Sequence, residues 1–227
     1  MAKRRKWQDE YWLMLMQIYL QQPVGIKPVY SSSMVNLGLE LHIPPQVLMA
    51  KMQQIATLDT PRVERFWKAY SGSPWKLARA VKLLREMKGF GRADEFYDGV
   101  EVNETWEKDW QPLDDHIRLT PVMLTLVLDM YFRLTPATMV KETPEVQELA
   151  KHLKVSSGDV VEALAAYQCC DPYLRSGHFA SSARRRATLP PVLLQACQTL
   201  WQRYGNGDTE TLAALAEQLA TYYRKEE

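Results

Sequence analysis

The feature that most constrains the fold of this 227-residue chain is an internal repeat of its apolar pattern. When the sequence is shifted by 112 positions, residues 12–61 align with residues 124–173 without a gap. Few residues are identical, but apolar positions coincide, as in Met14/Leu126, Leu15/Val127, Ile18/Met130, Ile43/Val155, Leu48/Val160, Met52/Leu164 and Ile55/Tyr167. Further on, Trp67 and Tyr70 match Trp201 and Tyr204 at a larger offset, so the second copy carries an insertion. A repeat of this length predicts two related halves.

Each half has the residue spacing of helices and little strand signal. Serines at 31–33, Thr143-Pro144 and Asp208 are helix-start signals, because their side chains can accept hydrogen bonds from exposed N–H groups and proline suits a first turn. The expected helices are 8–21, 33–41, 45–57, 62–71 and 75–88 in the first half, and 120–134, 144–153, 157–169, 190–204 and 208–224 in the second. The sequence therefore predicts an all-α fold.

An acidic linker is expected between the two helical domains. Residues 93–117 carry nine carboxylates and one lysine, with a short hairpin expected at Val100–Val102. The first domain covers residues 1–92, and the second covers residues 118–227 with its insertion at about 173–188. The linker also offers an alternative partner for the basic residues that precede it.

Residues 37–55 and 149–167 carry small and apolar residues at the spacing needed by two helices that cross over a short turn. Gly38 and Ala150 stand where the two backbones approach, and apolar residues flank the turn in both copies. These two short stretches resemble the helix-turn-helix of bacterial and phage regulators. Both depart from that family at the turn, where glycine is usual and this chain has His42 or Lys154.

The resemblance implies that the second helix of the motif enters the major groove of DNA. Its expected exposed residues are Pro44, Pro45, Gln46, Val47, Met49, Gln53 and Gln54 in the first copy, and Ser156, Ser157, Gly158, Asp159, Val161 and Glu162 in the second. Gln46 and Gln53 can pair with adenine, whereas Asp159 and Glu162 would be repelled by phosphates. The alternative is that both units are scaffolds for protein contacts.

Positive charge is concentrated after the first motif. Residues 62–92 contain nine Lys/Arg against two Glu, and four of these cations recur every third residue: Lys76, Arg79, Lys82 and Arg85. Such a helix face can follow a phosphate backbone, although it can equally be a solvated surface. Arg184, Arg185 and Arg186 in the insertion, and the basic residues 3–6, are expected to act as flexible basic arms.

No pattern favours catalysis, a metal or a cofactor. None of the four histidines belongs to a metal-binding pair, and there is no glycine-rich phosphate loop. No apolar stretch reaches the length of a membrane span, and three cysteines cannot form a disulfide framework, which favours a reducing, cytoplasmic setting. We therefore expect a non-enzymatic protein of transcription regulation that binds double-stranded DNA. The alternative is an interaction module that binds a protein partner or itself.

Overall fold

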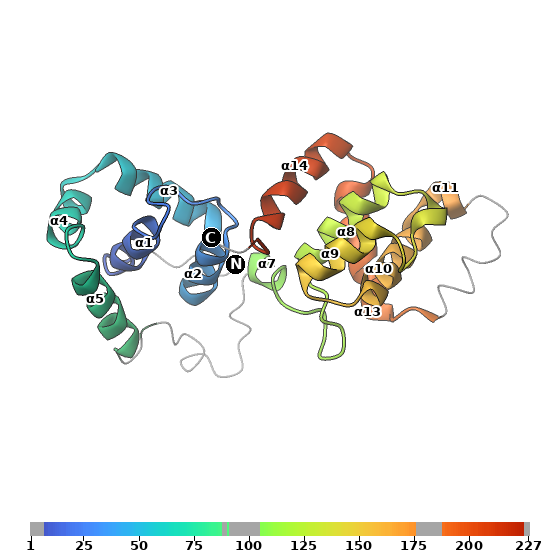
Figure 1. The fold of residues 1–227 in the computed structure, drawn as a ribbon, viewed down its shortest axis with the longest axis horizontal. Coiled ribbons are helices and arrows are strands. Elements are labelled where there is room, and N and C mark those ends of the chain that lie inside the picture. Colours follow the sequence, from blue (N-terminus) through green and yellow to red (C-terminus); the bar gives the residue numbers. More distant parts are fainter. Residues whose placement is uncertain (1–6, 88–89, 91–104, 176–187, 225–227) are drawn as a thin grey trace. The chain divides into compact units, whose positions relative to one another are not determined.

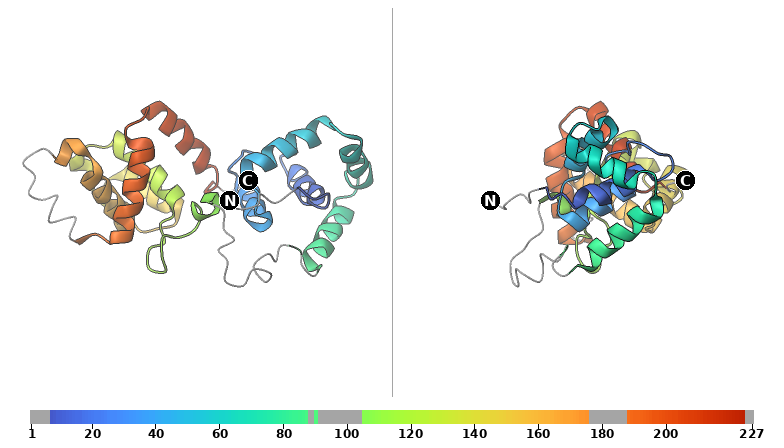
Figure 2. Two further views of the ribbon diagram at one scale, coloured as in Figure 1. Left: turned by 180° about the vertical axis from the view of Figure 1, so that it is seen from behind. Right: turned by 90° about the vertical axis from the view of Figure 1, so that its left-hand side faces the viewer.

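The computed structural model describes residues 7–87, 90, 105–175 and 188–224. Among these residues the secondary structure is entirely helical, which confirms the predicted all-α class (Figure 1). The chain divides into unit 1, which runs to Glu107, and unit 2, from Lys108 to Arg224 (Figure 2). No helix in the described ranges is long and apolar enough to cross a bilayer.

Unit 1 is built around its first helix. Its helices are α1 (Tyr11–Tyr19), α2 (Ser32–Leu41), α3 (Pro45–Thr57), α4 (Pro61–Tyr70), α5 (Pro74–Glu86) and the start of the short α7 (Thr105–Lys108). Helices α2, α3, α4 and α5 all contact α1, which lies between them (Figure 1). The core is therefore formed by buried apolar side chains of α1, such as Leu15, and of the helices around it, among them Met34, Leu41, Leu48 and Met52.

Unit 2 is built around α8 and α10. Its elements are α8 (Pro121–Arg133), the 3-10 turn η1 (Pro136–Thr138), α9 (Pro144–Leu153), α10 (Ser157–Cys170), α11 (Pro172–Arg175), α13 (Pro191–Leu200), the π-helical turn η2 (Trp201–Gly205) and α14 (Thr209–Ala220). The hydroxyl of Tyr167 donates to the Leu124 carbonyl at 2.9 Å and thereby joins α10 to α8. Burial raises the pKa of the neighbouring Cys197 thiol well above its usual range, so this cysteine is a neutral packing residue.

Most helices begin close to the expected positions, although neither Ser31 nor Thr143 accepts a hydrogen bond from the helix it precedes. The helix expected at 8–21 is shorter, from Tyr11 to Tyr19, and the helix expected at 208–224 ends at Ala220. The four helices of the two motifs, α2, α3, α9 and α10, begin and end within one residue of the expected positions. Helix α8 is one residue shorter at each end, because Thr120 and Leu134 occupy cap positions. The helix expected at 190–204 instead changes into a π-helical turn at Trp201. Only glycine fits at position 205, since a Cβ there would lie 2.7 Å from the Trp201 ring.

The start of α14 gives a direct test of a cap. The Asp208 carboxylate accepts hydrogen bonds from the hydroxyl and N–H of Thr211 and from the N–H of Glu210, and these bonds lower the pKa of Asp208. We expect Asp208→Ala to lower the melting temperature at neutral pH. Only the ionised carboxylate makes the full cap. The difference in melting temperature between Asp208→Ala and the parent should therefore have its full size above about pH 4 and disappear as the pH falls through the lowered pKa of Asp208. Thermal melts of both proteins from pH 2 to pH 7 measure this, and a difference independent of pH would contradict it.

Candidate nucleic-acid interface

Both motifs turn through the same unusual backbone conformation. His42 and Lys154 adopt left-handed φ angles of 55° and 58°, at the positions where the resemblance expects glycine. In each motif the residue after the turn donates its N–H back to the preceding helix, from Ile43 to Gly38 at 2.9 Å and from Val155 to Ala150 at 3.0 Å. A non-glycine residue in this conformation costs on the order of 1–2 kcal/mol, so surrounding contacts must hold the turn.

The turn of unit 1 is held by residues of α7. Glu107 is only 2% exposed, and its carboxylate lies 2.8 Å from Nδ1 of the half-buried His42. The Trp106 ring covers Gly38, because a Cβ on Gly38 would lie 3.4 Å from Cη2 of that ring and 2.8 Å from the Ile43 carbonyl oxygen. Glu107, one of the carboxylates in the expected acidic linker, is therefore a buried structural residue of unit 1.

Helix α3 presents an open face without a carboxylate. Its exposed residues are Gln46, Val47, Ala50, Gln53, Ala56 and Thr57. Gln46 is partly engaged, since its amide donates to the Tyr30 hydroxyl at 2.6 Å, whereas Gln53 is exposed. Of the other residues expected on this face, Pro45 is buried and Pro44, Met49 and Gln54 are half-buried, because they belong to the side that faces α1 and α2. The two glutamines named from the sequence thus lie on one accessible helix face.

Helix α10 has no comparable face. None of its residues, from Ser157 to Cys170, is exposed, so the expected exposure of Asp159 and Glu162 is wrong. Asp159 accepts the Ser156 N–H at 2.9 Å and caps its own helix. Helix α10 packs against α8, α9 and α13 of the same unit, and this packing leaves all its side chains buried or half-buried. It therefore presents less accessible surface than α3.

The cations of α5 differ in their partners. Arg85 is held by Glu40 of α2, with Nε and Nη2 at 2.7 and 2.8 Å from the two carboxylate oxygens, and this bond raises the pKa of Arg85. Lys82 lies 3.8 Å from Glu86 on its own helix, an exposed pair of little strength. Within the described residues, Lys76 and Arg79 have no carboxylate partner.

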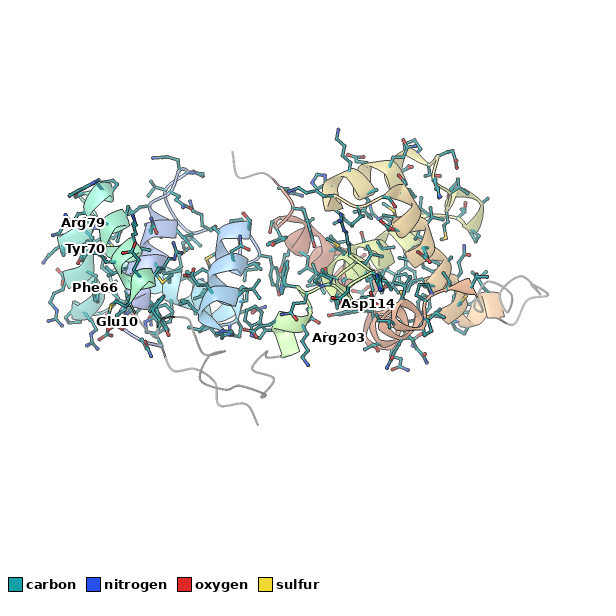
Figure 3. The ribbon with its side chains drawn as sticks, turned by 90° about the horizontal axis from the view of Figure 1, so that it is seen from below. Glu10, Phe66, Tyr70, Arg79, Asp114 and Arg203 are labelled. Carbon is teal, nitrogen blue, oxygen red and sulfur yellow. The ribbon has the colours of Figure 1, made fainter. Side chains whose placement is uncertain are left out.

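Lys76 and Arg79 instead lie over aromatic rings. The Lys76 ammonium is 5.1 Å from the centre of the Tyr70 ring and donates to the Ala69 carbonyl at 3.2 Å. The Arg79 guanidinium is 5.7 Å from the ring of Trp75, which is 71% exposed. Tyr70 and Arg79 are labelled at this end of the unit in Figure 3. Exposed aromatic rings beside cations are typical of surfaces that bind nucleic acids or proteins, and the sequence alone did not single out Trp75.

Several sequence predictions fall outside the described residues. These ranges contain Arg184, Arg185 and Arg186, the basic residues 3–6, the hairpin at Val100–Val102 and residues 93–104 of the acidic linker. In the part of the chain that the structure describes, no group of three or more His, Cys, Asp or Glu side chains could hold a metal ion. The candidate interface therefore consists of the α3 face and the exposed cations of α5.

Comparison of the chain with protein-family models, with curated proteins and with solved structures finds no match.

Proposed function

We propose that this chain is a non-enzymatic regulatory protein that binds double-stranded DNA through unit 1. Helix α3 would enter the major groove, and exposed cations of α5 would contact phosphates. The observation that carries this proposal is the exposed face of α3, which has no carboxylate and follows a short turn held by the buried Glu107. Amide side chains such as Gln53 are suited to base edges, and Ala50 is small enough to contact a thymine methyl group.

We further propose that the two units are related copies, of which one has lost the capacity to read DNA. In support, the bounds of α2 and α9 are related by the same shift of the sequence as the apolar pattern, and His42 and Lys154 share the left-handed turn. The packing partners also correspond, since α1 contacts α5 and α3 while α8 contacts α14 and α10. Unit 2, whose α10 is covered, would serve in structure or in protein contacts.

Binding to a pool of random-sequence duplexes, measured by fluorescence anisotropy at several salt concentrations, tests this function. We expect the affinity of the parent to fall steeply with salt, because phosphate contacts release counterions. The variant Ala50→Glu/Gln53→Glu places two carboxylates against the groove and should bind at least tenfold more weakly. Ala214→Glu/Gln218→Glu, at two exposed positions of α14 in unit 2, adds the same charge; it is the matched control and should bind like the parent. Failure of the parent to retain duplex DNA at low salt would refute the proposal.

A protein-binding module is the second candidate, and the surface of α5 favours it. Trp75, Leu83 and Met87 are 71%, 54% and 61% exposed. Trp75, Arg79 and Leu83 follow one another at four-residue spacing and form a ridge along the helix, and Met87 comes directly after the helix end. Exposed Trp and Arg side chains of this kind often anchor protein interfaces. If the ridge mediates self-association, Trp75→Ala/Leu83→Ala should shift the chain to a smaller species in sedimentation.

A further inference from the structure

Unit 2 contains a cavity between three helices that the proposed DNA contacts do not use. It has a volume of about 290 Å³ and lies between α8, α9 and α14. Its inner wall is apolar and includes the buried residues Leu126, Leu153 and Ala216. The polar side chains that line it are Asp129, Arg133, His152, Glu217 and Tyr223. A pocket with an apolar wall and a few polar groups has the general character of a ligand site.

The cavity exists because α14 carries small residues on the side that faces it. Ala213, Ala216 and Ala220 all line the space, and their spacing of three and four residues places them on one helix face. Larger side chains at these positions would fill the gap between α14 and α8.

In unit 1 the corresponding place is occupied by an ion pair. The buried positions of α5 and α14 correspond one by one, as Leu77/Leu212, Val81/Ala216 and Leu84/Leu219. Arg85 therefore corresponds to Ala220, and Glu40, which binds Arg85 through two hydrogen bonds, corresponds to His152. Ala220 and His152 both line the cavity. This step rests on the proposed relation between the units, whereas the cavity and its charges do not.

The charges around the cavity favour a cation. Asp129 and Glu217 contribute two carboxylates, and Arg133 contributes one guanidinium. Arg133 is already bound to Asp129, with Nη2 2.6 Å from the carboxylate, and the Asp129 side chain is only 14% exposed. An incoming anion would meet the excess of negative charge. A guanidinium on an alkyl chain can pack its weakly hydrated faces on leucine and alanine while its N–H groups reach a carboxylate.

We propose that this cavity binds an alkylguanidinium group of the size of an arginine side chain. It would take the place in unit 2 that Arg85 fills in unit 1. The group can belong to a free small guanidine or to an arginine of a partner protein, and the chemistry of recognition is the same in both cases.

The test is an NMR titration of the full chain, labelled at its alanine methyl groups, with n-butylguanidinium chloride. We expect saturable shifts of Ala213, Ala216 and Ala220 with a Kd of about 1–10 mM, as suits a ligand of this size. The uncharged isostere n-butylurea should bind at least threefold more weakly. Absence of saturable shifts, equal binding of n-butylurea or tighter binding of butyrate would each overturn the proposal.

Two variants and a matched control locate the site. Ala220→Arg should fill the cavity from within and abolish the shifts of Ala213 and Ala216, whereas Ala214→Arg, exposed on the same helix, should leave them unchanged. The surface substitution Glu217→Gln, which is compatible with folding, should weaken n-butylguanidinium binding about threefold. An unchanged Kd in Glu217→Gln, or continued binding in folded Ala220→Arg, would contradict the site.

Two further measurements follow: the first identifies the source of the guanidinium group, and the second tests the correspondence between the two units. Tighter binding of acetyl-Gly-Arg-Gly-amide than of n-butylguanidinium supports a protein arginine, and the reverse supports a free guanidine. The double variant Ala220→Arg/His152→Glu rebuilds the ion pair of unit 1 and should melt at a higher temperature than Ala220→Arg. A lower melting temperature would contradict the correspondence between the units, but it would leave the measured binding to n-butylguanidinium intact.

Discussion

Reversing three exposed charges of α5 together, in Lys76→Glu/Arg79→Glu/Lys82→Glu, is expected to lower the affinity of the chain for duplex DNA by about 100-fold at low salt. Each lysine or arginine that neutralises a phosphate adds roughly 0.9 to the slope of log affinity against log salt concentration. The slope measured for the variant should therefore be smaller than that of the parent by about 2 to 3. Arg85 is left unchanged because its bond to Glu40 joins α5 to α2.

The matched control for this variant reverses three exposed cations of unit 2, Arg118, Lys141 and Lys151. It changes the net charge of the chain by the same amount, so it separates a local contact from a general electrostatic effect. We expect the control to bind DNA within about threefold of the parent. Equal losses in both variants would show that α5 is no specific phosphate-binding surface.

Gly38→Leu is expected to destabilise unit 1 by roughly 1–3 kcal/mol, because the new side chain overpacks the crossing of α2 and α3. Even the first added carbon would lie 2.8 Å from the Ile43 carbonyl oxygen, which is backbone and cannot rotate away. For a unit of this size each kcal/mol corresponds to a fall of about 4–8 °C in melting temperature. Calorimetry of the full chain measures the effect.

Gly72→Leu is the control, because it makes the same glycine-to-leucine change at a position where the new side chain has room. A Cβ on Gly72 would meet nothing within 4 Å, so leucine is tolerated there and the melting temperature should change little. Ala150→Leu, at the corresponding buried position of unit 2, should destabilise unit 2 in the same way. A neutral Gly38→Leu would contradict the close approach of α2 and α3.

The helices were predictable because local signals determine them. Thr60, Ser73, Thr120, Ser156 and Asp208 each accept a hydrogen bond from the first turn of the helix that they precede, and such caps can be identified from neighbouring residues alone. The apolar spacing likewise determined which sides of α2 and α3 are buried. Burial of Gly38 and Ala150 was expected for the same reason and is confirmed.

The accessibility of the site was not predictable, because it depends on distant segments. Helix α10, which ends at Cys170, packs against α13, which begins only at Pro191. Arg85 has the same sequence spacing as Lys76 and Arg79, but a carboxylate 45 residues earlier holds it. Glu107 was counted only as one of the linker carboxylates, since nothing near it in sequence shows that His42, 65 residues away, is its partner.

The two left-handed turns differ in whether glycine can replace their residue without the loss of a contact. His42 is held by the buried Glu107, so glycine at position 42 would relieve the backbone strain but would also remove the Glu107 contact. Lys154 has the same backbone conformation, but its side chain is exposed. Glycine adopts this conformation without steric cost. The second turn is thus a natural starting point for thermostabilised variants, while the first is fixed by its own side chain.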